Sequence, residues 1–553
     1  MLESSAAALP DGYSALNVRE KFAWQQRSAQ LLWGFVALGM TLRLLRYLMC
    51  EPMWGDECML ASNFLERGYG ELLKPLDFGQ ICPPVFLWIE LFLVRLFGFH
   101  EWSLRLFPLL CGLASVWLFQ HTASRLLKGW QFLLAVAVFS VSYYPIRHAA
   151  EVKPYASDLF FSLVLIALAV EWLRKPEQTR WLWALVGVAP LAMTISYPAV
   201  FVAGAVSLAL VMIVLQQPKR TWLAYAVFNL AVAATFLGPV MGVAKQQEQH
   251  STGIKEMWQA GFPPSATKPL ELTGWLLNAH TGHMMAYPVG SGRGGSLLTF
   301  VCCVAAIVFL WKRRLWPWLL LCLGPFALSL AASFLQKYPY GTTARTTQYL
   351  VPSICLLMGL GLAELLARIP RLALRRRMAQ GTLAALGVLG LGIMVFEVTH
   401  PYKTSHDWRH REFARWLWTD KAHNAELVCV GGDLQTDVCS GKWHNITHIY
   451  RCFQRLYSAE HRTGFQPPKF DKVTSDHPLR CVVYTSSGMS LNRQEVNQWL
   501  DQMQQKWELA GREVHHINPG TGPVYEQQYE IYDFVPRTSS STLQAQHPEP
   551  SRH

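Results

Sequence analysis

The feature that most constrains this chain is a series of eleven apolar runs that recur between Leu31 and Val398. A helix of about 20 apolar residues crosses a hydrocarbon core about 30 Å thick. Only 16% of the 553 residues are charged, whereas soluble domains have roughly 25%. The sequence therefore predicts an α-helical polytopic membrane protein with about eleven transmembrane helices.

The predicted spans cover residues 31–49, 104–123, 130–145, 159–173, 181–196, 200–215, 222–243, 296–311, 315–335, 350–367 and 381–398. The segment from Pro83 to Gly98 is also apolar, but it starts with two prolines and contains Glu90 and Arg95. As a helix it would reach only about 22 Å. We therefore expect an interfacial helix in the first outer loop, and not a further span.

The short loops on one side of this arrangement are rich in lysine and arginine. The positive-inside rule assigns that side to the cytoplasm, together with the N-terminal tail of residues 1–30. The formal net charge of +12 is then explained by loop topology and an anionic bilayer surface. A nucleic-acid partner is not expected, because the sequence contains no basic stretch interleaved with aromatic residues.

The chain changes character after residue 398, where charges return and apolar runs become short. We expect residues 31–398 to form the membrane domain, residues 399–536 a small periplasmic α/β domain, and residues 537–553 a disordered tail. Within the α/β domain the patterns predict helices at 412–421 and 492–507, and strands at 426–430, 480–484 and 529–534.

An adjacent acidic pair, Asp56 and Glu57, follows the first span. Trp54 and Gly55 precede it and an apolar stretch follows, which favours a packed junction. Two carboxylates at a membrane face are suited to base chemistry or to cation binding. The alternative is a solvated pair in a loop.

The stretch from Tyr143 to Asp158 is a dense polar insert between two apolar spans, and it includes Arg147. Glu151 and Asp158 are seven residues apart, which would place both carboxylates on one face if the segment is helical. The alternative is an interfacial belt, in which tyrosines and basic residues anchor the helix ends and arginine pairs with glutamate.

A third outward-facing cluster, at residues 336–349, contains Arg345 among tyrosines and threonines. Its guanidinium offers a planar fork of donors suited to phosphate oxygens. The alternative is again an anchor at a helix end. Taken together, the three clusters indicate group transfer from a membrane-embedded, phosphate-linked donor.

In this order the motifs resemble the type-C glycosyltransferases that use polyprenyl-phosphate sugars, the superfamily of protein O-mannosyltransferases and aminoarabinose transferases. The resemblance covers roughly the first 400 residues. It is carried by Asp56-Glu57, Pro83-Pro84, Leu96-Phe97-Gly98 with Ser103 to Pro108, the 147–158 loop, and Arg345 with Tyr349 to Pro352. One departure is that Ile81-Cys82 precede the paired prolines, where the family often has a basic residue.

The resemblance implies an inverting transfer in which Asp56 acts as general base on the acceptor hydroxyl, or orients it. Glu57 would position the acceptor or a cation, and a divalent ion, Mg²⁺ or Mn²⁺, could bind this pair. The donor phosphate would be bound by Arg345, Lys153, Arg105 and Arg147. Acceptor-binding or supporting roles fall to Glu151, Asp158 and Tyr155.

The implied partners are a polyprenyl-phosphate sugar, an acceptor that is a lipid, a glycan or a protein, and the membrane lipids. The implied location is a bacterial inner membrane. The alternative function is a transporter or flippase of lipid-linked sugars, in which the carboxylates would bind protons or a coupling cation. Transporters tend to place such groups near the bilayer midplane, whereas the predicted spans are almost free of acidic residues.

Overall fold

The computed structural model describes residues 18–249, 258–265, 267–291, 294–399, 405–417, 428–430, 479–486, 493–518 and 527–537. The chain divides into two compact units. The first comprises Met1–Cys50 with Arg67–Pro401, and the second comprises Glu51–Glu66 with Tyr402–His553. In the described residues the first unit is built of helices, and the strands belong to the second unit. The predicted fold class is thereby confirmed.

Seven long apolar helices of the described chain could cross a membrane. They are Gln26–Leu48 within α1 (Val18–Leu48), α6 (Leu106–Leu126), α9 (Tyr155–Arg174), Lys219–Gln249 (α12, η3 and α13), α17 (Trp316–Phe334), Arg345–Ala367 (η6, Arg345–Leu350, with α18, Val351–Ala367) and α19 (Leu372–Thr399). Four shorter apolar helices are α7 (Gly129–Val141), α10 (Arg180–Ile195), α11 (Ala199–Val214) and α16 (Leu297–Lys312). Each of these eleven segments overlaps one predicted span.

The segment predicted as an interfacial helix forms α4 (Pro84–Phe97). Pro84 occupies the first turn, where its missing N–H costs nothing, and Gly98 ends the helix with a φ of +86°. The remaining short helices of the first unit are η1 (Glu71–Leu73), η2 (Asp77–Gly79), α5 (Glu101–Leu104), α8 (Tyr143–His148), η4 (Gln259–Gly261), α15 (Pro269–Thr281) and η5 (His283–Met285).

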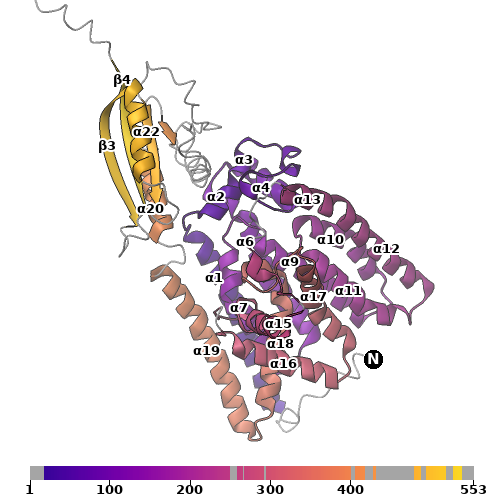
Figure 1. Cartoon of the computed structure of the whole chain (residues 1–553). Coiled ribbons are helices and arrows are strands. Elements are labelled where there is room, and N and C mark those ends of the chain that lie inside the picture. Colours follow the sequence, from indigo (N-terminus) through magenta and orange to yellow (C-terminus); the bar gives the residue numbers. More distant parts are fainter. Residues whose placement is uncertain are drawn as a thin grey trace, which may run out of the picture. The chain divides into compact units, whose positions relative to one another are not determined.

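Helices α7, α9 and α18 form the centre of the first unit (Figure 1). All residues of α7 from Leu133 to Val141 are buried, and α18 packs against both α7 and α16. Small residues allow these close approaches: a Cβ atom on Gly359 would lie 2.4 Å from the Cβ of Ala135, and one on Gly361 would lie 1.8 Å from the carbonyl oxygen of Cys302. Close backbone contact at small residues is the usual packing mode of membrane helices.

Gly361→Ala is expected to destabilise the helical unit, because the added methyl group has no room between α18 and α16. Overpacking of this kind typically costs about 1–3 kcal/mol. We expect a lower midpoint of thermal unfolding in detergent. Gly387→Ala in α19 is the matched control, since a Cβ atom there meets nothing within 4 Å. An unchanged midpoint for Gly361→Ala would contradict the close packing.

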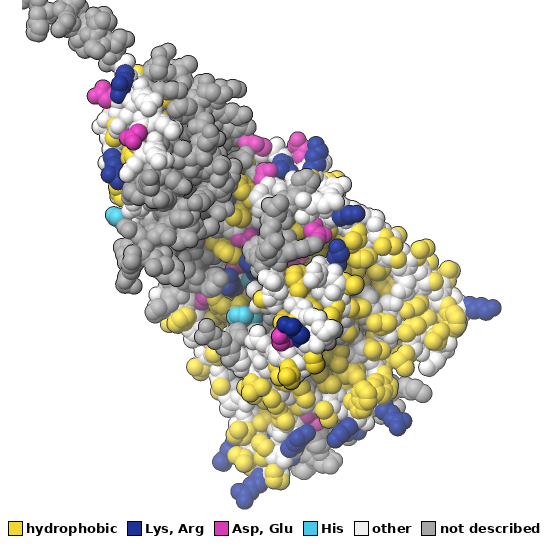
Figure 2. Space-filling model, in the orientation of Figure 1, with side chains coloured by type: hydrophobic (Ala, Val, Ile, Leu, Met, Phe, Trp, Pro, Cys, Tyr) yellow, Lys and Arg dark blue, Asp and Glu magenta, His cyan; other side chains and the backbone are white. Residues whose placement is uncertain are grey.

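Hydrophobic side chains cover much of the visible face of the helical unit, and lysine and arginine side chains gather at one end (Figure 2). The exposed apolar residues include Leu223, Leu230 and Leu237, which lie in α12 (Lys219–Thr235) and η3 (Phe236–Val240). Helix α13 (Met241–Gln249) continues this segment. Such an apolar outer surface is what a hydrocarbon environment requires.

The second unit contains a four-stranded sheet with the strand order β1-β2-β4-β3. Its strands are β1 (Val428–Val430), β2 (Leu479–Ser486), β3 (Trp507–Asn518) and β4 (Gln527–Pro536). Only the β1–β2 pairing is parallel. Helices α20 (Ser405–Trp416) and α22 (Arg493–Lys506) pack against β3, and α2 (Gly55–Ala61) and α3 (Asn63–Glu66) complete the described helices.

The sheet contains one strand, β3, that the sequence patterns did not predict. Its sequence mixes charged residues and histidines with few apolar positions, because it is an edge strand with β4 as its one neighbour. The predicted tail at 537–553 lies outside the described residues after Arg537. The same holds for residues 418–421 of the predicted helix at 412–421.

Candidate active site

The polar insert between α7 and α9 folds as a short helix followed by a turn. Helix α8 ends at His148, residues 149–154 form the turn, and Pro154 caps α9, which starts at Tyr155. Helical backbone is disfavoured at the residue before a proline, which here is Lys153, so α8 and α9 do not form one continuous helix. The condition under which Glu151 and Asp158 would share a helical face, a continuous helix, is therefore not met.

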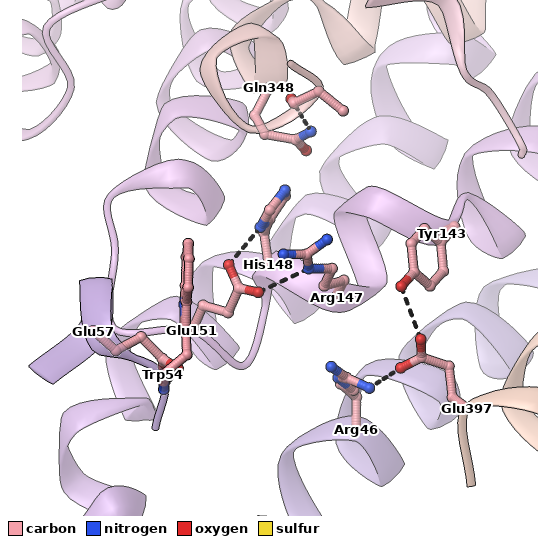
Figure 3. Close-up of polar contacts among 10 residues, drawn as sticks. Arg46, Trp54, Glu57, Tyr143, Arg147, His148, Glu151, Gln348 and Glu397 are labelled. Atoms are coloured by element: carbon pink, nitrogen blue, oxygen red, sulfur yellow. Dashed lines mark hydrogen bonds and ion pairs between the residues drawn. The ribbon is translucent and has the colours of Figure 1, made fainter. Parts of the chain in front are cut away.

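Glu151 is the centre of a buried cluster (Figure 3). Its Oε1 accepts a hydrogen bond from Arg147 Nε at 2.9 Å, and its Oε2 lies 2.7 Å from His148 Nδ1. The side chain of Glu151 is 1% exposed. Because an ionised carboxylate can only accept, His148 carries its proton on Nδ1. The cluster thus holds one negative charge against one guanidinium and an oriented imidazole.

Burial lowers the pKa of His148 below its ordinary value, although the neighbouring Glu151 carboxylate acts in the opposite direction. The imidazole is therefore neutral at pH 7. Below about pH 6.5 the unfolded chain takes up a proton before the folded chain does. The folded state consequently loses stability as the pH falls through this range.

Replacing His148 by glutamine is expected to weaken this pH dependence. The measured quantity is the change in thermal midpoint in detergent between pH 7.5 and pH 5.5, to which His148 contributes a fall. The fall contributed by His148 should be absent in His148→Gln, so the midpoint of the variant at pH 5.5 should rise relative to that of the wild type, because the imidazole whose proton affinity differs between the folded and unfolded states is gone. His100→Gln, at an exposed position, should behave as the wild type. An unchanged pH dependence in His148→Gln would refute the assignment.

Lys153 is buried and donates a hydrogen bond to Gln80 Oε1 at 2.6 Å. Gln80 is followed by Ile81 and Cys82 and then by the paired prolines Pro83 and Pro84, at the start of α4. The fold therefore brings the ammonium group of Lys153 close to the segment before the paired prolines, where the sequence has no basic residue. Cys82 is held in turn by Gln247, whose amide accepts from the Cys82 N–H at 3.0 Å and donates to its carbonyl at 3.1 Å.

Arg345 opens η6, which packs against α8 and α9. Its charge acts on His148 and contributes to lowering the pKa of that side chain. Its guanidinium carbon also lies 5.0 Å from the centroid of the Trp258 ring. The fold thus assembles Arg345 with the loop that carries Glu151 and Lys153, although about 190 residues separate them in the sequence.

The other predicted residues of the first unit lie around this cluster or beside it. The ring of Tyr155 meets His148 edge-on at 5.0 Å between centroids. Asp158 is buried in the first turn of α9. Arg105 is also buried, at the junction of α5 and α6. It lies within electrostatic range of Tyr47 on α1.

Asp56 and Glu57 lie in α2, which belongs to the second unit. Glu57 is buried and its Oε2 accepts a hydrogen bond from the Trp54 N–H at 3.3 Å, which caps the helix. Asp56 is half-buried. Side chains of consecutive helical residues point about 100° apart, so the two carboxylates do not face the same way. This geometry favours separate roles for the two carboxylates over joint chelation of one ion.

No group of three or more His, Cys, Asp or Glu side chains is arranged to hold a metal ion in the described part of the chain. The Mg²⁺ or Mn²⁺ ion suggested for Asp56 and Glu57 stays a prediction.

A second buried network joins the C-terminal ends of α1 and α19 (Figure 3). Arg46 of α1 forms an ion pair with Glu397 of α19. Tyr143 of α8 donates a hydrogen bond to the other carboxylate oxygen of Glu397 at 2.8 Å. The sequence patterns missed this network, and also His148 and Trp258. Tyr143 and His148 lie inside the polar insert that the sequence analysis singled out, whereas Arg46, Glu397 and Trp258 come from other segments of the chain.

Two comparisons with known proteins bear on this arrangement. A family model described as dolichyl-phosphate-mannose-protein mannosyltransferase matches residues 82–243. The structure of ArnT from Cupriavidus metallidurans in the apo state is similar with a TM-score of 0.54 and 12% identity, covering 90% of this chain and 98% of that chain. The chain therefore shares the fold of ArnT. The resemblance drawn from the motifs is thereby confirmed.

Two further solved structures are similar to the chain. ArnT from the same organism bound to undecaprenyl phosphate gives a TM-score of 0.52 at 13% identity, with 90% of this chain and 97% of that chain covered. The oligosaccharyltransferase AglB from Archaeoglobus fulgidus, in complex with an inhibitory peptide and a dolichol-phosphate, gives 0.49 at 10% identity and covers 93% and 74%. No curated protein sequence matches the chain.

Proposed function

We propose that this protein is a membrane glycosyltransferase that moves a sugar from a polyprenyl-phosphate donor to an acceptor hydroxyl by inverting displacement. The observation that carries the proposal is the packing of η6, which bears Arg345, against the loop that holds Lys153, Arg147 and Glu151. In a fold shared with ArnT, which was solved with undecaprenyl phosphate, these cations form a site suited to a lipid phosphate.

The reaction joins the acceptor oxygen to C1 of the sugar while the bond from C1 to the phosphate oxygen breaks. Asp56 accepts the proton of the acceptor hydroxyl, or orients that hydroxyl. Arg345 and Lys153 stabilise the negative charge that grows on the leaving phosphate oxygen, and Arg105 and Arg147 assist. Attack from the side opposite the leaving group inverts the configuration at C1.

The residues around Glu151 support this chemistry. Glu151 fixes Arg147 and His148 by charge-assisted hydrogen bonds. Glu57 caps α2 and so fixes the backbone that carries Asp56. We assign Asp158 and Tyr155 to acceptor binding. The acceptor is a lipid, a glycan or a protein, and the sugar is a hexose or a pentose.

The flippase alternative is less well supported. A coupling carboxylate would be expected near the middle of a span. The two buried acids that the first unit contributes to the site lie instead at helix boundaries, Glu151 in the turn before α9 and Asp158 in its first turn. The two comparisons also favour a transferase, because the fold is similar to that of ArnT and the matching family model is described as a mannosyltransferase.

We further propose a bacterial inner membrane as the location, with residues 1–30 in the cytoplasm, residues 31–398 in the membrane and residues 399–536 in the periplasm. Single cysteines placed near Gly55 and near His148, in a background with blocked native thiols, should both react with an impermeant reagent added from outside. Reaction at only one of them would contradict this topology, in which both segments face outward.

The function is tested by supplying membranes that contain the protein with a panel of labelled sugars linked either to polyprenyl phosphate or to a nucleotide. We expect transfer from one polyprenyl-phosphate sugar and none from nucleotide sugars in membranes freed of endogenous polyprenyl phosphate. Membranes without the protein are the control. Transfer from a nucleotide sugar under these conditions would refute the proposed donor class.

A further inference from the structure

We propose that Trp258 is a positioning residue whose indole ring holds the Arg345 guanidinium in the orientation that receives the donor phosphate. The inference rests on the proposed phosphate-binding role of Arg345. Trp258 lies in the outer loop between α13 and α15, more than 80 residues before Arg345 in the sequence.

The contact between the two side chains has the geometry of a cation–π interaction. The guanidinium carbon of Arg345 lies over the Trp258 ring at 5.0 Å from its centroid, inside the limit of about 6 Å for this interaction. All N–H groups of a guanidinium lie in its plane. A guanidinium that lies over an aromatic ring can still present its in-plane N–H groups to a phosphate.

The backbone of the Trp258 segment is fixed to the turn that leads to Arg345. The Trp258 carbonyl accepts from the Gly261 N–H at 2.8 Å, and the Gly261 carbonyl accepts from the Tyr340 N–H at 2.8 Å and from Ser333 Oγ at 3.1 Å. A Cβ atom on Gly261 would lie 2.6 Å from the Cβ of Pro339. Only glycine allows this approach, so the position of Trp258 is set by the same turn as that of Arg345.

Helix α15 holds the segment from a second direction. Trp275 Nε1 donates to the Ala260 carbonyl at 3.0 Å, and its ring packs on Tyr340 at 5.9 Å between centroids. Two elements thus fix the residues that follow Trp258. A side chain held before the ligand arrives reduces the ordering cost of binding. Trp258 therefore raises donor affinity by restricting Arg345, without needing to contact the donor.

The test measures KM and kcat for the donor in wild-type protein and in Trp258→Leu, Trp258→Phe and Trp258→Tyr. The donor KM of Trp258→Leu should rise about 5- to 30-fold, the range of a cation–π contact. Phenylalanine and tyrosine should restore part of the loss, since they keep an aromatic face. The KM for the acceptor should stay unchanged. Trp183→Leu, at an exposed position on α10, is the matched control.

A double-mutant cycle with Arg345→Ala separates this inference from the proposed function. The effect of Trp258→Leu should disappear when Arg345 is already replaced, because the tryptophan acts through the guanidinium. An equal rise of KM in both backgrounds would overturn the inference, and so would a fall of the donor KM in Trp258→Leu. If Arg345→Ala alone leaves donor KM and kcat unchanged, the proposed phosphate-binding role fails.

Discussion

Asp56→Asn should reduce glycosyl transfer by about two to four orders of magnitude while leaving the protein folded and in the membrane. A general base in the right position contributes typically 10²- to 10⁴-fold. Asparagine keeps the size and the polarity of the side chain but cannot accept the proton of the acceptor hydroxyl. The measurement is initial transfer rate from the identified donor, normalised to the amount of protein.

Glu66→Gln is the matched control for this experiment. Glu66 is an exposed acidic residue of the same segment, at the end of α3. Its replacement removes one negative charge from this face and should leave the rate within about two-fold, as expected for an exposed charge. Equal rates for Asp56→Asn and the wild type would remove Asp56 as the base.

Arg345→Ala should raise the donor KM and lower kcat, with a combined loss in kcat/KM of about 10²- to 10³-fold. Removing one preorganised donor from a developing oxyanion typically has an effect of this size. Arg345→Lys keeps the charge but loses the planar fork, so its kcat/KM should lie between that of the wild type and that of Arg345→Ala. The measurement is steady-state kinetics with the donor varied at fixed acceptor.

Lys268→Ala provides the control for Arg345, because Lys268 is an exposed cation near the start of α15 that pairs with Glu271. It should leave the donor KM unchanged. A lysine variant at position 345 that is as inactive as the alanine variant would show that the shape of the guanidinium matters more than its charge. Full activity of Arg345→Ala would refute the phosphate-binding role.

The sequence predicted the helical part of the fold well, since each apolar run directly reports a helix that must satisfy its backbone inside a membrane. It also singled out the loop with Arg147 and Glu151. Their pairing has a local spacing, since Arg147 and Glu151 are an i,i+4 pair and His148 and Glu151 an i,i+3 pair. The interpretation of this stretch as an interfacial belt had already paired arginine with glutamate.

The contacts that the sequence could not predict join distant segments. Lys153 meets Gln80, Arg345 meets Trp258, and Arg46 pairs with Glu397 across more than 300 residues. No short sequence spacing identifies these pairs, because each pair depends on which helices and loops become neighbours in the fold. Strand β3 was missed for another reason, because an edge strand with a polar sequence lacks the alternation that identifies a half-buried strand.

The most direct test of the account uses purified protein in proteoliposomes with a doubly labelled donor, one label on the sugar and one on the lipid phosphate. If the protein is a glycosyltransferase, the sugar label should move to the acceptor and free polyprenyl phosphate should appear in equal amount. Movement of the intact donor between leaflets, with both labels still joined, would contradict the account and support a flippase.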